Sequence, residues 1–271
     1  MDLSEKKLED SVLLTGAIAV EAVLFSEARE VRRVMVDSAM DYRRLEPVRR
    51  AAKARRLELE PRSREQLDEA AGHGKHGGVI AEVGPRRFVG LADLLTYSGS
   101  ERALIVMLDG VEDPFNFGQA IRSLYAAGCH GVVLRPRNWA APAEAGAAPG
   151  AEAIIARASA GTTELMPMAV VETPEEAAAF YRERGLAVIA TADRPEAESF
   201  RDAPLTDAMF LLIGGEKRGV KRSFLDQADR VIRVPYARRF DHALGTVAAV
   251  SVIGFEIARQ REAAGVSGRG V

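Results

Sequence analysis

The chain has 271 residues, 47% of them hydrophobic, and its 37 basic and 39 acidic residues give a formal net charge of −2. This length permits a sizeable core and favours two domains. The charged N-terminus and the lack of any long uncharged apolar run argue against export and membrane insertion, so we expect a cytoplasmic protein. A single cysteine, Cys129, and four scattered histidines exclude an internal disulfide and predict no metal site.

The first part of the chain, from about Ser11 to Val83, alternates helical patterns with short strands. The predicted helices cover 16–26, 43–54 and 63–71, and the predicted strands cover 31–36, 57–59 and 79–83. Ser63 stands at the expected N-cap of the third helix. The pattern is typical of a small α/β domain, which we place at 1–90, followed by a linker at 91–101 and a second domain at 102–271.

Residues 43–56 (RRLEPVRRAAKARR) carry seven basic residues and one acidic residue, Glu46. Such a run is typical of a surface that contacts phosphates. The alternatives are a solvated helix face and a surface for a protein partner. We favour RNA because acidic residues do not balance the basic ones. The candidate RNA-binding residues are Arg43, Arg44, Arg49, Arg50, Lys53 and Arg56.

The second domain repeats strand and helix regularly. The predicted strands cover 104–108, 132–134, 168–171, 187–191, 209–214 and 231–234, and a final helix covers 245–261. Because the strands are apolar runs without alternation, they predict a parallel sheet with helices on both faces. Ligands bind such sheets at the carboxyl ends of the strands.

The segment DGVEDPFNFGQAIRSLYAAGC, 109–129, joins the first of these strands to a helix. Asn116 stands where a helix N-cap is expected, and Arg122 follows on the helix. Near a strand's carboxyl end, these two side chains suit an anion or a ribose. The alternative is that Asn116 only caps the helix and Arg122 only solvates it.

Three further stretches have the composition of ligand-binding loops: ARASAG at 156–161, IGGEKRGV at 213–220 and VPYARRFDHALGTV at 234–247. The small residues of the first would let its backbone approach a ligand closely. The sequence contains no P-loop, no early G-x-G-x-x-G and no G-x-S-x-G, which disfavours nucleoside triphosphate, ordinary dinucleotide and serine-hydrolase sites.

In this order, with TGAIAVEAV and KHGGVIA in the first domain, these motifs resemble the TrmH (SpoU) family of RNA ribose 2′-O-methyltransferases, and the first domain is similar to the substrate-binding domain of its ribosomal RNA branch. The resemblance covers nearly the whole chain. It implies S-adenosylmethionine as the methyl donor, a trefoil knot in the catalytic domain, and a homodimer with the active site at the subunit boundary. It further implies a structured RNA substrate, with 23S ribosomal RNA favoured over transfer RNA.

The resemblance also implies roles for individual residues. Asn116, Gly118 and Arg122 form the first motif, and Glu216 is the polar residue of the second. Arg122, Asn116 and Glu216 are therefore the candidate catalytic residues. The candidate donor-binding residues are Gly214, Gly215, Gly219, Ile232, Val234, Leu244 and Thr246.

The third motif departs from the family pattern S-L-N-V-S, because this chain has Ala243, Leu244, Gly245, Thr246 and Val247 there. Backbone contacts to the donor could persist, but the side-chain hydrogen bonds would be lost unless Thr246, Asp241 or His242 replaces them. The leading hypothesis is an active RNA 2′-O-methyltransferase. The alternative is a protein of the same fold that binds RNA without modifying it.

Overall fold

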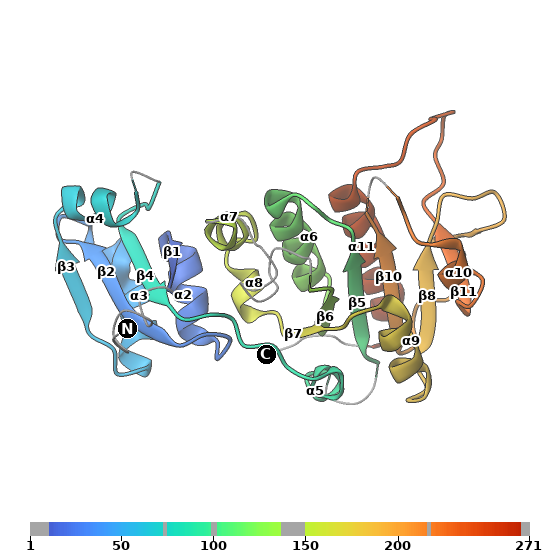
Figure 1. Cartoon of the computed structure of the whole chain (residues 1–271), viewed down its shortest axis with the longest axis horizontal. Coiled ribbons are helices and arrows are strands. Elements are labelled where there is room, and N and C mark those ends of the chain that lie inside the picture. The colour runs from blue at the N-terminus through green and yellow to red at the C-terminus, as the bar shows by residue number, and fades with distance from the viewer. Residues whose placement is uncertain (1–10, 73–74, 99–101, 137–149, 216–217, 267–271) are drawn as a thin grey trace. The chain divides into compact units, whose positions relative to one another are not determined.

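The protein is described by a computed structural model that covers residues 11–72, 75–98, 102–136, 150–215 and 218–266. The chain divides into two compact units, coloured along the sequence in Figure 1. Unit 1 contains residues 1–87 and 142–165, and unit 2 contains 88–141 and 166–271. Residues 150–165, which the sequence assigned to the second domain, therefore group with the first.

Unit 1 is built on a four-stranded mixed sheet. Its elements are β1 (Val12–Thr15), α2 (Ala17–Phe25), β2 (Val31–Asp37), α3 (Tyr42–Ala54), β3 (Leu59–Arg62), α4 (Arg64–Ala70) and β4 (Val79–Val83). The strand order is β1-β4-β2-β3, with β4 antiparallel to both neighbours and β2 parallel to β3. The predicted small α/β domain is confirmed, including the Ser63 cap of α4, whereas the short strand β1 was not predicted.

Two helices from later in the chain, α7 (Ala151–Ala158) and α8 (Thr162–Leu165), complete unit 1. Gly161, between them, has a φ of +79°, and a Cβ there would lie 2.7 Å from the Cβ of Ala22 and 3.0 Å from the carbonyl oxygen of Ile18. The small residues of ARASAG therefore let this segment pack closely against α2. Their approach to a ligand stays a prediction.

A buried ion cluster ties α7 and α8 to the rest of unit 1. Glu164 accepts hydrogen bonds from Arg29 at 2.9 Å and from Arg86 at 2.5 Å, and Arg29 also pairs with Glu152. The side chains of Arg29, Arg86 and Glu164 are at most 5% exposed. Burial works to raise the pKa of Glu164, but Arg86 and Arg29 outweigh it and hold that pKa below its ordinary value.

Unit 2 contains a seven-stranded sheet, parallel throughout, in the order β7-β6-β5-β10-β8-β11-β9. Its strands are β5 (Leu104–Asp109), β6 (Gly131–Leu134), β7 (Met168–Val170), β8 (Ala187–Thr191), β9 (Glu198–Ser199), β10 (Met209–Gly214) and β11 (Arg230–Arg233). Its helices are α5 (Leu91–Thr96), α6 (Pro114–Ala126), α9 (Pro174–Arg182), α10 (Arg222–Leu225) and α11 (Thr246–Ala263). The predicted parallel sheet is confirmed.

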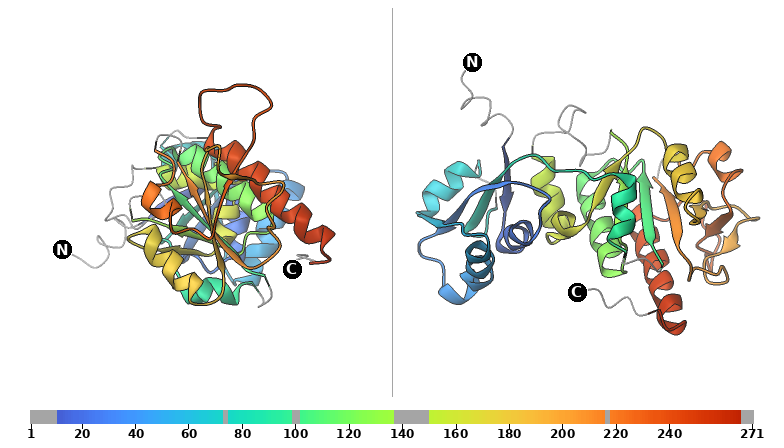
Figure 2. Two further views of the ribbon diagram at one scale, coloured as in Figure 1. Left: turned by 90° about the vertical axis from the view of Figure 1, so that its right-hand side faces the viewer. Right: turned by 90° about the horizontal axis from the view of Figure 1, so that it is seen from below.

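Side chains on both faces of the central strands are buried. Ile105 and Met107 of β5 pack in one cluster with residues of α5, α9 and α10. The alternate residues of β5, Val106 and Leu108, are fully buried on the opposite face. There α6 and α11 lie side by side, as Figure 2 shows. Helix α5 begins inside the predicted linker, and β9 was not predicted. No helix within the described ranges is long and apolar enough to cross a membrane.

Candidate active site

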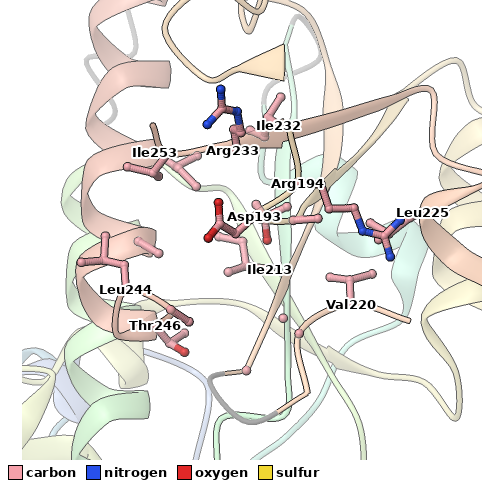
Figure 3. A pocket seen from close by; sticks show the side chains of 18 of the residues that line it. Asp193, Arg194, Ile213, Val220, Leu225, Ile232, Arg233, Leu244, Thr246 and Ile253 are labelled. Atoms are coloured by element: carbon pink, nitrogen blue, oxygen red, sulfur yellow. The ribbon is translucent and has the colours of Figure 1, made fainter. Parts of the chain in front are cut away.

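A pocket of about 280 Å³ lies in unit 2 at the carboxyl ends of β8, β10 and β11 (Figure 3). This edge of the sheet is where a parallel α/β fold binds ligands. Its wall comes from the last residues of these three strands and the residues that follow them, from Leu225 of α10, and from the first half of α11. The lining residues are Thr191, Ala192, Asp193, Arg194, Ile213, Gly214, Gly215, Arg218, Gly219, Val220, Leu225, Ile232, Arg233, Val234, Tyr236, Ala243, Leu244, Thr246, Ala249 and Ile253.

Two glycines at the end of β10 permit a close approach of backbones beside the pocket. A Cβ on Gly214 would lie 2.5 Å from the carbonyl carbon of Gly219, and a Cβ on Gly215 would lie 2.1 Å from the carbonyl oxygen of Gly110. The N–H of Gly215 also donates to the carbonyl of Asp109 at 2.6 Å. Any side chain at either glycine would push these loops apart, so this part of the wall has to be bare backbone.

The opposite wall depends on a hydrogen bond within the segment between β11 and α11. The backbone N–H of Leu244 donates to the hydroxyl of Tyr236 at 2.9 Å, and both residues line the pocket. Because that N–H is used, the backbone group that Leu244 can offer a ligand is its carbonyl. Helix α11 then begins after Gly245, which provides no side-chain cap.

The charged lining residues are Asp193, Arg194, Arg218 and Arg233. Three arginines against one aspartate make the described rim positive although the whole chain is slightly acidic. Asp193 is exposed, and Figure 3 shows its carboxylate near the side chains of Ile213 and Ile253. Within the described part of the chain, no group of three or more His, Cys, Asp or Glu residues could hold a metal ion.

Comparison with known protein families identifies the family of this chain. The family model described as the SpoU rRNA Methylase family matches residues 103–253, more than half of the chain. This chain belongs to the SpoU rRNA methylase family. A second model, described as RNA 2′-O ribose methyltransferase substrate binding, matches residues 13–89.

The chain is also similar to individual members along almost its whole length. It is 30% identical to the 23S rRNA (guanosine-2′-O-)-methyltransferase RlmB of Ralstonia nicotianae, over 94% of this chain and 98% of that protein. Two solved structures share the fold. The SpoU methyltransferase AviRb of Streptomyces viridochromogenes, in complex with AdoMet, has a TM-score of 0.74 at 21% identity and covers 97% of this chain and 95% of its own. An AdoMet-bound rRNA methyltransferase of Sinorhizobium meliloti has a TM-score of 0.72 at 22% identity, with 95% and 90% covered.

The seven residues predicted to bind the methyl donor come together, although they span residues 214–246 of the chain. All of them line the pocket: Gly214, Gly215, Gly219, Ile232, Val234, Leu244 and Thr246. The predicted Glu216 lies outside the described residues, but its neighbours Gly215 and Arg218 are in the lining.

The altered third motif, residues 243–247, is supported by different side chains. Of the three replacements considered, only Thr246 lines the pocket, where it is buried. Asp241 pairs with Arg239 at 3.2 Å, and His242 stacks edge-on against Phe240. The hydroxyl of Tyr236 instead supplies a hydrogen bond to the motif, and sequence reasoning missed this residue.

The first motif lies on α6, outside the pocket lining. The N-cap of α6 is Asp113, whose carboxylate accepts the N–H of Asn116 at 2.7 Å, so the prediction that Asn116 caps the helix is wrong. Its side chain is thereby released from capping. Arg122 is exposed, while its neighbour Ser123 accepts a hydrogen bond from Ser251 of α11 at 2.8 Å. Gly118 is buried in the same helix.

The predicted RNA-binding residues of unit 1 share one helix and its C-terminal end. Helix α3 buries Leu45, Val48, Ala51 and Ala52. The six candidates are all exposed: Arg43, Arg44, Arg49, Arg50, Lys53 and Arg56. Arg50 approaches Glu21 only to 3.8 Å, and Arg49 lies over the ring of Tyr42. The helix therefore presents a basic face that acidic neighbours do not neutralise.

The pocket also contains residues that the sequence analysis did not single out. Thr191, the last residue of β8, and the three residues after it, Ala192 to Arg194, line the cavity. Because β8 itself was predicted, the rule that ligands bind at the carboxyl ends of parallel strands could have identified this segment.

Proposed function

We propose that this protein is an S-adenosylmethionine-dependent RNA 2′-O-ribose methyltransferase that acts on 23S ribosomal RNA, and hence works in the cytoplasm. One observation carries the proposal: the seven residues expected to bind the donor line a single pocket. Family membership and the full-length similarity to a 23S rRNA (guanosine-2′-O-)-methyltransferase support the same reaction and substrate.

The pocket fits S-adenosylmethionine chemically. Apolar side chains such as Ile213, Ile232 and Ile253 would pack against the adenine. The backbone at Gly214 and the carbonyl of Leu244 would hydrogen-bond to the polar edge of the adenine. The Asp193 carboxylate suits the ribose hydroxyls or the ammonium group of the donor. When bound, the donor supplies an electrophilic methyl group on a sulfonium.

Arg122 would act on the RNA. A guanidinium does not readily give up a proton near neutral pH, so a role as general base is chemically unfavourable. As a clamp on the phosphate beside the target ribose, Arg122 would orient the 2′-hydroxyl and stabilise the negative charge that develops on its oxygen. That oxygen would bond to the methyl carbon as the carbon–sulfur bond breaks, and the hydroxyl proton would pass to solvent water. The side chain of Asn116, which does not cap α6, would hydrogen-bond to the RNA beside Arg122. Glu216 remains a predicted catalytic residue.

The proposed active form is a homodimer, because Arg122 lies outside the pocket of its own protomer. The packed pair of helices α6 and α11 exposes large apolar side chains: Phe115, Tyr125, Val252 and Phe255. Such a surface is suited to burial against a second copy. Dimerisation through these helices would place Arg122 at the boundary where the family resemblance expects the active site. The resemblance also implies a trefoil knot, which we include in the proposal.

The basic face of α3 would bind phosphates of the structured RNA in the family's substrate-binding domain. Unit 1 would thus contribute affinity for the RNA, while unit 2 would bind the methyl donor.

The changed third motif favours one alternative, an RNA-binding member of the family that transfers no methyl group. Titration of the purified protein with S-adenosylmethionine by calorimetry, followed by incubation with labelled donor and unmodified 23S rRNA or transfer RNA, separates the possibilities. The proposal predicts saturable donor binding and label in 23S rRNA. No donor binding would favour the alternative, and label only in transfer RNA would change the substrate.

A further inference from the structure

The segment between β11 and α11, residues 234–245, has a chemistry that the methyl-donor pocket does not explain. We call it the β11–α11 loop. Figures 1 and 2 show it, in orange-red, projecting from unit 2. Arg238, Arg239, Phe240 and His242 are all exposed along it. At the base of the loop, Tyr236 and Leu244 turn back into the pocket wall. The loop therefore connects an exposed tip directly to the proposed donor site.

Aromatic rings give the tip a defined surface. The ring of Phe240 packs edge-on with Tyr236, at 5.5 Å between centroids, and with His242, at 5.7 Å. Even so, Phe240 remains 50% exposed. Tyr236 is fixed in turn by its hydrogen bond to Leu244. A large apolar ring held in place on a projecting loop, without being buried, is suited to contact with a partner.

The charge around this ring favours a polyanion. Arg238 and Arg239 directly precede Phe240 in the sequence. The single carboxylate within the loop, Asp241, is paired with Arg239, and both side chains are more than 70% exposed. Such a solvated pair contributes little stability, so a phosphate could displace the carboxylate. The pocket rim below adds the positive charges of Arg194 and Arg218.

An exposed aromatic ring next to arginines in an exposed loop is a combination that binds single-stranded nucleic acid, since bases stack on the ring and phosphates pair with the cations. We propose that the β11–α11 loop is a second RNA-docking element, on which an unpaired base next to the target ribose stacks against Phe240 while Arg238 and Arg239 hold the adjoining phosphates. This inference rests on the proposed function and adds that the RNA is unpaired beside the methylated nucleotide.

The test compares Phe240→Ala, Phe240→Trp and the double variant Arg238→Ala/Arg239→Ala in the full-length protein. The probe is 23S rRNA transcribed in vitro, with affinity measured by filter binding at several salt concentrations. Donor affinity, sedimentation and thermal melting are measured alongside. Tyr97→Ala is a matched control for an exposed aromatic residue in unit 2. Arg182→Ala/Arg184→Ala is the control for charge. Arg182 is the last residue of α9 and Arg184 follows the helix, before the amino end of β8, at the edge of the sheet away from the pocket.

We expect Phe240→Ala to weaken RNA binding about tenfold, as the loss of one stacked base does, and Phe240→Trp to preserve it. Donor affinity and the sedimentation coefficient should not change. The double arginine variant should make the negative slope of log affinity against log salt shallower by about 1.4, because each lost phosphate contact on a single strand removes about 0.7.

Wild-type RNA affinity in Phe240→Ala would overturn the docking proposal, as would a loss of affinity no larger than in Tyr97→Ala. Dissociation of the dimer in Phe240→Ala would overturn it as well, by assigning the loop to the subunit interface. A wild-type protein that binds neither the donor nor the RNA would instead overturn the proposed function, and this inference with it.

Discussion

The hydroxyl of Tyr236 accepts the backbone N–H of Leu244 at 2.9 Å, and the two residues form neighbouring parts of one pocket wall. In the family pattern S-L-N-V-S, serine and asparagine side chains stand around this leucine. Here those positions are Ala243 and Gly245, which cannot hydrogen-bond through a side chain. A tyrosine eight residues away in sequence instead fixes the backbone of Leu244. The backbone of Leu244 is therefore held in the pocket wall although the motif has changed.

Replacement of this tyrosine by phenylalanine tests that role. Tyr236→Phe keeps the ring but removes the acceptor of the Leu244 N–H. We expect donor affinity to fall about fivefold, which corresponds to the roughly 1 kcal/mol of one neutral hydrogen bond. Calorimetric titration with S-adenosylmethionine measures the change, and Tyr97→Phe is the control. Unchanged affinity in Tyr236→Phe would show that Leu244 does not depend on this bond.

A methyl group at Gly214 should disrupt the other wall. The Cβ of Gly214→Ala would lie 2.5 Å from backbone of Gly219, so the two loops must separate. We expect donor affinity to fall more than about tenfold and the melting temperature to drop, because backbone cannot yield as a flexible side chain can. Gly84→Ala is the control, since its Cβ would be in ordinary contact, 3.6 Å from Glu30. Normal donor binding by Gly214→Ala would refute this account of the wall.

Arg122 should be needed for methyl transfer and not for donor binding. We expect Arg122→Ala to reduce the transfer rate at least about a hundredfold, as the loss of a charged transition-state contact does, with donor affinity nearly intact because Arg122 does not line the pocket. Single-turnover transfer from labelled donor to 23S rRNA measures the rate. Arg184→Ala serves as the control, and a rate equal to that of the wild type would remove Arg122 from the mechanism.

Charge reversal on α3 should weaken RNA binding uniformly. Arg49 and Lys53 are exposed one turn apart on the basic face. The double variant Arg49→Glu/Lys53→Glu should bind RNA at least about tenfold more weakly, with a shallower salt dependence. Arg182→Glu/Arg184→Glu changes the total charge equally and controls for a nonspecific effect. If both double variants bind RNA alike, the basic face serves a protein partner or only solvates the helix.

The buried carboxylate of Glu164 should make unit 1 sensitive to acid. Its pKa is depressed in the folded protein, so ionised Glu164 stabilises the fold above the ordinary carboxyl pKa of about 4.3, and this contribution is lost as the pH falls through the folded value. Near neutral pH, Glu164→Gln should cost about 3–5 kcal/mol, because it leaves Arg29 and Arg86 without their buried partner.

Urea unfolding of wild type and Glu164→Gln between pH 7 and pH 3 measures this contribution. The difference in free energy of unfolding between the two proteins should decrease toward acid pH. Glu183→Gln, at a glutamate side chain that is 79% exposed, is the control. A difference that does not vary with pH would contradict the assignment of an ionised Glu164.

Much of unit 2 could be predicted from its sequence, because each buried parallel strand is a continuous apolar run followed by glycine or a polar turn. The ends of β8 and β10 fell at the predicted residues, Thr191 and Gly214. The convergence of Gly214 with Leu244 could not follow from periodicity, since it depends on how distant loops cross in space. It was available only through the family resemblance.

The errors have identifiable physical causes. Asp113 followed by Pro114 is itself a helix-start signal, an acceptor side chain before proline at the first helical position, and it outweighs the later Asn116. Helices α7 and α8 join unit 1 through the buried Glu164 cluster and the contact at Gly161, and neither is visible in local sequence. Strand β9 has two residues, too few to show any period.

The most direct test of the account is detection of the methylated nucleoside itself. Unmodified 23S rRNA is incubated with S-adenosylmethionine and either the wild-type protein or Gly214→Ala, digested to nucleosides and analysed by mass spectrometry. The account predicts a new 2′-O-methylated ribonucleoside with the wild-type protein and little or none with the variant. A wild-type protein that binds the RNA but yields no 2′-O-methylated nucleoside, or that methylates a base instead, would contradict it.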